Sequence, residues 1–256
     1  NPDFGQVESD ELVVNFTQNE TFYSDKRPFF SENHSLFDVK GYRFFYIINT
    51  RRIGSAPDYN CSKYTDSLKN MCEEASQEGI TDIDYAIRYT QQGESIDFGF
   101  LSASEADEQF SQGNDFYAIR ARKNSDNYSL GYLGTYTERP VLDREAKVHS
   151  IDLTYRPTDK VRVDTVFISS NIEQGLDDIK KSGEAFRFRL TASPRKGRWH
   201  DMGVFFFGKE LDITDMGYQI SNNWLFLGSQ NGLKFSDYDE SSIFLSNEIE
   251  VGYSFE

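Results

Sequence analysis

The sequence predicts an all-β protein, folded as an antiparallel up-and-down β-barrel that spans a membrane. Three observations favour this fold class: the composition, segments in which apolar and polar residues alternate, and connections between them that alternate in length. The chain has 256 residues with 22 Phe and 15 Tyr, and aromatic residues are enriched in strands. Its formal charge of −15 argues against nucleic acid as a partner, because binding phosphates needs clustered Lys and Arg.

The segment Thr81–Thr90 shows the alternation most clearly. Its odd-numbered positions from 83 to 89 are Ile, Tyr, Ile and Tyr, whereas Asp84 and Arg88 lie between them. Side chains of a strand point alternately to its two faces, so one face here is apolar and the other charged. A soluble protein would bury the apolar face in a core, and an outer-membrane barrel would turn it to lipid.

Later segments follow the same rule, and the chain is expected to supply roughly a dozen strands of a partial barrel. Each segment is roughly 9–11 residues long, the length that crosses a membrane when a strand is tilted. The clearest are Ser95–Ala103, Tyr128–Thr137, Lys147–Arg156, Ala185–Ala192 and Ile243–Phe255.

The connections alternate between short turns and longer polar stretches, as periplasmic turns and extracellular loops do in outer-membrane barrels. The turns are expected at Gln92-Gly93, Asn124–Asp126, Pro157–Asp159, Pro194–Gly197 and Asn231-Gly232. The longer stretches are Ser104–Asn114, Glu138–Ala146, Ser170–Glu184 and Lys209–Ser221.

Acidic residues gather in these longer stretches and predict a negative rim at one end of the barrel. Such a rim is either a solvated surface or a weak site for divalent cations, which prefer carboxylate oxygens. The residues concerned are Glu105, Asp107, Glu108, Glu138, Asp143, Glu145, Glu173, Asp177, Asp178, Glu210, Asp212 and Asp215.

Two cysteines, Cys61 and Cys72, lie in a polar stretch that is predicted as a loop. A disulfide in an oxidising compartment, two free thiols and a weak metal site are the alternatives there. No run approaches the roughly 18 apolar residues that a membrane-spanning helix needs, which leaves barrels open. A secretory signal, if one exists, is expected to lie outside this sequence.

Six short motifs of the chain are not explained by alternation alone. They are Asn1–Glu8, Glu20–Phe22, Lys26–Phe30, Thr50–Gly54, Tyr132–Arg144 and Asp215–Tyr218, with Lys26, Arg27, Pro28, Arg51 and Arg52 the most specific residues. These motifs resemble a family of uncharacterised bacterial outer-membrane proteins that carry a domain of unknown function. The resemblance implies a C-terminal β-barrel that follows an N-terminal domain similar to family-9 carbohydrate-binding modules. It also implies location in the outer membrane, and it offers no catalytic residues.

With this resemblance the chain divides into two parts of one domain. Residues 1–80 are a segment that leads into the barrel, with the family motifs and the cysteine-containing loop, and residues 81–256 are barrel strands. The chain is expected to begin at or near the barrel, without the carbohydrate-binding domain, and to stop before the barrel closes, because strand edges need partners.

The polar faces of the strands supply the candidate site residues. Inside a barrel they either form an ion-paired network that braces the wall or line a passage that selects solutes by charge and size. The arginines of the family motifs are expected to form salt bridges at the barrel mouth. The lumen candidates are Asp84, Arg88, Asp97, Arg120, Arg122, Asp152, Arg156, Arg162, Asp164, Arg187 and Arg189.

Three functions remain in view. The first is an integral outer-membrane barrel that acts as a channel or handles a small solute or glycan, with outer-membrane lipid or lipopolysaccharide around it. The second is a soluble extracellular β-sandwich that binds glycans, and the third is a carbohydrate-active hydrolase using carboxylate pairs such as Asp82/Asp84 or Asp237/Asp239. No catalytic residue, metal ligand or cofactor is predicted, since the three histidines are scattered and nucleophile and phosphate-binding motifs are absent. Whether the protein is an enzyme stays open, with the balance against it.

Overall fold

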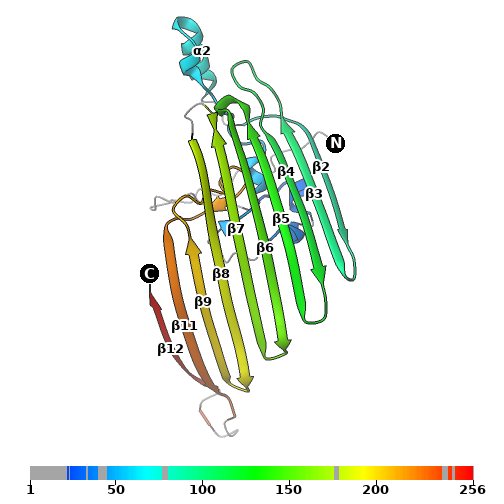
Figure 1. The fold of residues 1–256 in the computed structure, drawn as a ribbon, viewed down its shortest axis with the longest axis vertical. Helices are drawn as coiled ribbons and strands as arrows, with labels where there is room; N and C mark the ends of the chain where they lie inside the picture. The colour runs from blue at the N-terminus through cyan, green and yellow to red at the C-terminus, as the bar shows by residue number, and fades with distance from the viewer. Residues whose placement is uncertain are drawn as a thin grey trace.

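The structure is a computed structural model, and it describes residues 22, 24–32, 34–39, 45–76, 80–175, 179–237, 242–243 and 246–255. Within these residues the protein is all-β, and one antiparallel sheet of ten strands dominates it (Figure 1). Neighbours in the sheet follow one another along the chain, so the all-β, antiparallel, up-and-down prediction is confirmed. The strands are β2 Ile83–Gln92, β3 Ile96–Glu105, β4 Asp115–Asn124, β5 Tyr128–Arg139, β6 Arg144–Thr158, β7 Val161–Gln174, β8 Ile179–Arg195, β9 Arg198–Phe207, β11 Trp224–Phe235 and β12 Asn247–Phe255.

The sheet is open in the described part of the chain. Its edges are β2 and β12, which do not pair with each other. Several strands are also longer than the sequence predicts, since β6, β7 and β8 have 15, 14 and 17 residues. The predicted connection Ser170–Glu184 is therefore mostly strand, because its polar residues pair across the ladder. Asp177 and Asp178 lie outside the described residues.

Four of the five predicted turns lie at the ends of paired strands, and the fifth is wrong. Asn231-Gly232 lies inside β11, paired with His200 and Trp199 of β9. The Trp199 ring occupies the space where a side chain of residue 232 would project, so this glycine permits a close approach and makes no turn. The predicted strand Ile243–Phe255 is too long, since β12 begins at Asn247 and Ile243 is 89 % exposed.

Opposite ends of the sheet carry connections of different length. The turn end joins β2–β3, β4–β5, β6–β7 and β8–β9 through two or three residues each. The loop end holds the connections at residues 106–114, 140–143 and 208–223, together with residue 175 after β7. The hairpin of β11 and β12 departs from the pattern, because its strands end and begin at the turn end with Phe235 and Asn247, which are far apart in the sequence for a short turn (Figure 1).

One face of the sheet, here called the inner face, is covered at the loop end by two other segments. α1 (Pro28–Ser31), η1 (His34–Leu36) and η2 (Thr50–Arg52) lie behind the sheet in Figure 1, and β1 (Phe45–Tyr46) pairs there with β10 (Tyr218–Gln219). Their side chains join those of the sheet in one hydrophobic core. The covering residues include Phe30, Leu36, Phe37, Val39, Phe45, Ile47, Ile48, Ile53, Leu211, Ile213 and Met216.

The opposite face, the outer face, is apolar and uncovered. Among the described residues, all but four of the exposed large hydrophobic side chains lie on the ten strands, and register and alternation place every one of these on the outer face. The four exceptions are Leu68, Met71, Ile80 and Ile243. The outer-face residues are Tyr85, Ile87, Tyr89, Ile96, Ile119, Leu130, Tyr132, Ile151, Leu153, Tyr155, Phe167, Phe186, Met202, Phe206, Leu225, Leu227, Leu233, Phe235, Ile249, Val251, Tyr253 and Phe255.

A helical finger projects beyond the loop end of the sheet (Figure 1). It consists of η3 (Cys61–Lys63) and α2 (Asp66–Ala75), which a disulfide between Cys61 and Cys72 joins. Contacts of the Tyr64 ring with Phe110, at 5.4 Å between centroids, attach the finger to the β3–β4 connection. None of the helices in the described ranges is both long enough and apolar enough to cross a membrane.

Candidate functional site

The candidate site is the part of the inner face nearer the turn end, which the covering segment reaches only at its border, near Leu36 and Asp38, and where the side chains become charged. On β3, β4, β6, β7, β8 and β9 many of the inner-facing positions near this end are polar, and arginine and aspartate are frequent among them. Alternation places these residues opposite the apolar outer face on the same strands. The structure thereby brings most of the predicted lumen candidates together on one surface.

Arg120 is the most buried charge of this surface, with 1 % of its surface exposed. Its guanidinium donates two hydrogen bonds to the Asp152 carboxylate, at 2.5 and 3.0 Å. Its Nε donates a third bond to the carbonyl of Leu36, at 3.1 Å. Arg120 therefore links β4, β6 and the covering segment, and its charge is compensated where it is buried.

A second pair lies next to the β2–β3 turn. Asp97 is buried and accepts hydrogen bonds from Arg122 Nε at 2.9 Å and from the Asn124 amide at 2.7 Å. The backbone N–H of Gly93 adds a longer bond at 3.2 Å. The predicted residues Asp97 and Arg122 thus bind each other and fix the turn.

Two further pairs continue across β7, β8 and β9. Arg162 donates to Asp164 at 2.6 and 2.8 Å, and the Thr154 hydroxyl donates to the same carboxylate at 2.6 Å. Arg189 forms a bidentate ion pair with Asp201, a residue that the sequence analysis did not single out. In each pair the positive guanidinium and the negative carboxylate neutralise each other, so the surface carries many charged groups but little net charge.

A hollow of about 110 Å³ lies among these pairs. Asp38 of the covering segment and Arg156 contribute exposed side chains to it, and Arg187 is buried beside Phe205, whose ring centroid is 5.5 Å from its guanidinium carbon. Within the described part of the chain, the Arg156 guanidinium makes no hydrogen bond or ion pair. The charged lining residues are Arg120, Arg122, Arg156, Arg187, Asp38, Asp152 and Asp164, a balance of plus one in a chain of −15.

Two lumen candidates lie elsewhere. Arg88 is on the inner face of β2 and binds the covering segment, donating to the carbonyl and the carboxylate of Glu32. Asp84 lies where the pairing of β2 with β3 shifts, between Ile83 and Tyr85, and is exposed. Asp84 was predicted to share a face with Arg88 because side chains alternate along a strand. The irregularity interrupts this alternation at Asp84.

The specific motif residues hold the covering segment together. Arg27 pairs with Asp25 at 2.7 Å and donates to the carbonyls of Thr50 and Ile53 at 2.7 and 2.9 Å, which ties α1 to η2. Pro28 begins α1, Lys26 is exposed beside it, and the Arg51 backbone N–H bonds the Asn49 side chain. Arg52 donates to the carbonyl of Gly217 at 3.2 Å. The motifs Asn1–Glu8 and Glu20-Thr21 lie outside the described residues.

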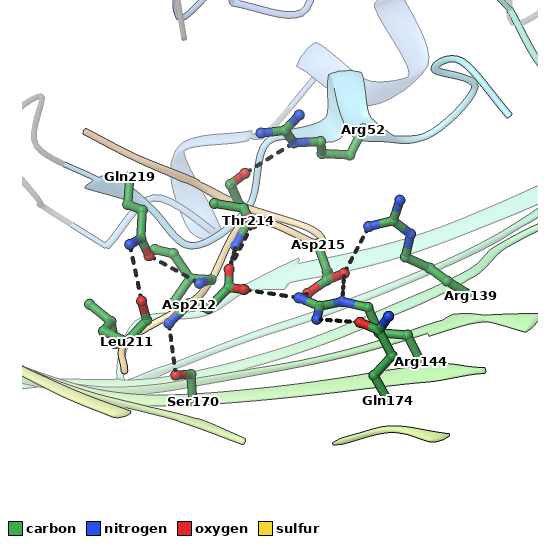
Figure 2. Close-up of polar contacts among 12 residues, drawn as sticks. Arg52, Arg139, Arg144, Ser170, Gln174, Leu211, Asp212, Thr214, Asp215 and Gln219 are labelled. Atoms are coloured by element: carbon green, nitrogen blue, oxygen red, sulfur yellow. Dashed lines mark hydrogen bonds and ion pairs between the residues drawn. The ribbon is translucent and has the colours of Figure 1, made fainter. Parts of the chain in front are cut away.

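A cluster that the sequence analysis did not predict fixes the loop before β10 to the sheet (Figure 2). Asp215 accepts hydrogen bonds from Arg139 at 3.1 Å and from two nitrogens of Arg144 at 2.7 Å. Arg144 also pairs with Asp212 at 2.9 Å, and Arg139 pairs with Asp58. Two acidic residues of the predicted negative rim therefore neutralise arginines of β5 and β6.

Electrostatics favour the ionised form of two carboxylates in the covering segments. Burial raises the pKa of Asp212, but hydrogen bonds from Thr214 and Arg144 outweigh burial and hold that pKa below its ordinary value of 3.8. Burial likewise raises the pKa of Asp25, and the bonds and charge of Arg27 bring it below 3.8. Both carboxylates act as anionic anchors at neutral pH.

The cluster of Figure 2 had a partial signal in the sequence, since Asp215–Tyr218 belongs to the motifs of the resemblance. Its pairing with β5 and β6 depends on contacts about 70 residues apart, which alternation cannot reveal. Across the described residues, no three His, Cys, Asp or Glu side chains are placed to hold a metal ion. A weak divalent-cation site at the acidic loops stays a prediction. Asp237 pairs with Lys196, and Asp239 is outside the described ranges.

Comparison with known proteins gives a family match over the first part of the chain. A family described as Domain of unknown function (DUF5916) matches residues 1–93. No curated protein and no solved structure matches. The matched span contains Lys26–Phe30, Thr50–Gly54 and β2, so it supports an uncharacterised domain family. The match gives no information about a barrel or about a carbohydrate-binding domain.

Proposed function

We propose that this chain forms a section of the wall of a bacterial outer-membrane β-barrel, with the outer face toward lipid and the inner face toward a lumen. The outer face carries the proposal, because each of the ten strands presents at least one exposed large hydrophobic side chain there. Soluble monomers rarely expose contiguous apolar patches above a few hundred Å². An apolar band across an antiparallel sheet is what a lipid-facing wall requires.

The edge of the apolar band supports this orientation. A row of charged residues crosses the outer face near the loop end, each directly paired with the next along the ladder. Tyr117 and Tyr136 pair with each other just inside this row, as aromatic residues do at the boundary between lipid and water. The charged residues are Asp115, Glu138, Glu145, Glu173 and Lys180.

The soluble sandwich is the less favoured alternative. A sandwich covers the apolar face of one sheet with a second sheet of similar size. In the described ranges the other sheet has two strands, β1 and β10, and it lies with the covering segments on the inner side. In a bilayer β2 and β12 need strand partners, since unpaired edges are not tolerated in lipid.

The inner face favours the handling of a small polar solute. The covering segments fill its loop-end half and reach Arg120, whereas the pairs Arg162–Asp164 and Arg189–Asp201 are partly exposed toward the turn end. Alternating fixed charges of both signs can select solutes by charge and size while staying compatible with water. Arg156 offers an exposed cation there.

The wall proposal is tested by the dependence of folding on lipid or detergent. The purified chain is expected to aggregate in plain buffer, to fold in detergent micelles, and to resist carbonate extraction once reconstituted in vesicles. A monomeric, folded chain in plain buffer with Ile151 and Phe167 accessible to water would refute the proposal.

Passage of solute is tested separately by swelling of vesicles that contain the protein. Permeation of small sugars and amino acids above that of empty vesicles is expected, with altered charge preference in Arg156→Glu. Asp159→Asn, in the exposed turn between β6 and β7, serves as a control that leaves permeation unchanged. If vesicles that contain the inserted protein are no more permeable than empty vesicles, the passage of solute is refuted and the wall proposal is unaffected.

A further inference from the structure

We propose that a hollow on the inner face of β9, β11 and β12 binds a neutral saccharide. The proposal rests on the proposed function in one respect, because it takes the inner face as open to a solute. The hollow measures about 610 Å³, which lies within the usual range for small-molecule sites. Its position beside the arginine-lined hollow makes it a separate part of the same surface.

Three glycines lie at the floor of the hollow. Gly203 and Gly228 lie directly opposite each other in the β9–β11 ladder, and Gly252 pairs with Gln230 on the next strand. All three are lining residues, and all three face inward by alternation. The side chains of Phe205, Phe226 and Gln230 lie against these glycines, at 3.0, 2.7 and 3.2 Å from where a Cβ atom would be. The glycines therefore let these side chains lie low on the sheet, and the hollow lies above them.

Aromatic rings form one wall. The Phe226 ring extends across Gly228, where a Cβ atom would come within 2.7 Å of it. Phe205 is buried and supports Phe226 in an edge-on contact with centroids 5.7 Å apart. Trp224 follows at 5.9 Å from Phe226. Phe226 itself is half-buried, so part of its ring is available for the apolar face of a ligand.

Polar groups border the same hollow. Arg189 and Asp201 bind each other through bidentate hydrogen bonds, so neither presents an uncompensated charge. Gln230, which pairs with Asp201 across the ladder, is exposed, and its amide makes no hydrogen bond with any residue that the structure describes. An amide supplies both donors and an acceptor, and so do a paired guanidinium and carboxylate together.

This combination selects a chemical class. An anion would have to compete with Asp201, and a cation with Arg189, so a charged ligand is disfavoured. A wholly apolar ligand would displace the water molecules that hydrogen-bond to Gln230 and to the ion pair, and it would offer no hydrogen bonds in their place. A sugar ring has hydroxyls that donate and accept and a C–H face that packs on an aromatic ring, and it fits both requirements.

The experiment uses the full chain in detergent micelles and its tryptophan fluorescence. One of the two tryptophans, Trp224, lies against Phe226 and reports on the hollow. Maltotriose, cellotriose, xylotriose and chitotriose are the neutral probes, and trigalacturonate is the anionic one. Saturable binding of at least one neutral probe, tighter than that of trigalacturonate, is expected.

Two substitutions and one control locate the binding. Gln230→Ala is expected to raise Kd about two- to tenfold, the effect of one hydrogen-bonding group. Phe226→Ala is expected to raise it further. Gln92→Ala is the matched control, because Gln92 is an exposed inner-face glutamine at the end of β2 and should leave Kd unchanged. If Phe226→Ala fails to fold, Gln230→Ala alone decides.

Three results would overturn the assignment: no binding of any neutral probe, tighter binding of trigalacturonate, or unchanged affinity in folded Gln230→Ala. Each of these can occur while the protein still inserts into vesicles, so they do not test the wall. Conversely, saccharide binding by a chain that needs no detergent would retain this site and refute the membrane proposal.

Discussion

Arg120 shows how strongly the inner face depends on compensated charge. Arg120→Met is expected to lower the free energy of unfolding by about 3–5 kcal/mol, because it leaves the Asp152 carboxylate without its cation beside the core. The measurement is chemical unfolding in detergent micelles, followed by circular dichroism.

A double variant separates lost charge compensation from lost packing. Arg120→Met combined with Asp152→Leu is expected to recover most of the stability, since no unpaired charge remains. Arg162→Met is the control, because the Arg162 side chain is 30 % exposed and its pair is worth about 1 kcal/mol or less. Equal losses for Arg120→Met and Arg162→Met would show that Arg120 is not buried as described.

Asp212 predicts a pH dependence of the stability of the covering segments. Its folded pKa is below the ordinary value of 3.8, so the folded state favours the carboxylate more than the unfolded chain does. The resulting stabilisation is present above pH 3.8 and is lost as the pH falls through the lower folded pKa. Thermal unfolding from pH 7 to pH 2 should therefore show a falling Tm below about pH 4.

The comparison with Asp212→Asn identifies the residue responsible. This variant is expected to start less stable at pH 7 and to lose less on acidification, since its side chain does not titrate. Asp159→Asn, at the exposed β6–β7 turn, should keep the wild-type profile. Identical acid profiles for the wild type and Asp212→Asn would contradict the role of the Arg144 pair.

At the scale of elements, the loop before β10 is packed onto bare backbone of the sheet. A Cβ at Gly183 would collide with the backbone of Leu211, so Gly183→Val should displace this loop and cost about 1–3 kcal/mol. Trypsin cleavage at the exposed Lys209 is expected to accelerate with it. Gly252→Ala is the control, since its nearest contact is the flexible Gln230 side chain at 3.2 Å; equal cleavage in both variants would refute the packing.

The helical finger should behave as a separate element. Reduction of the Cys61–Cys72 bridge is expected to accelerate trypsin cleavage after the exposed residues Lys63 and Lys69, because it loosens the backbone of the finger. The main unfolding transition should stay in place, because the finger lies outside the sheet. If the main transition instead falls by the roughly 2–4 kcal/mol typical of a lost disulfide, the finger stabilises the sheet itself.

The two faces of the strands could be predicted from the sequence, and the covering segments could not. The face of each side chain between Tyr128 and Tyr155 follows from the alternation of residues two apart. Leu130 and Ile151 could therefore be assigned to the apolar face without tertiary information. The site was predictable as far as Asp97, Arg120 and Asp152, whose faces alternation sets. Arg139, Arg144 and Asp58 were missed because their partners are distant in the chain, and Asp84 was misplaced by a bulge.

At the scale of the whole molecule, the ten strands form one continuous apolar outer face. A substitution at the centre of that face can therefore show whether lipid or water covers it. Ile151 lies between Tyr132 and Phe167 in the ladder and is 54 % exposed. In water Ile151→Arg should change stability by no more than about 0.5 kcal/mol, whereas in the middle of a bilayer it should cost about 2–4 kcal/mol. Urea unfolding in lipid vesicles measures the difference. Glu145→Arg, on the same strand and face but in the charged row, should cost about 0–1 kcal/mol there. If the two variants are equally stable in vesicles, lipid does not cover this face, and the apolar band must meet another protein surface.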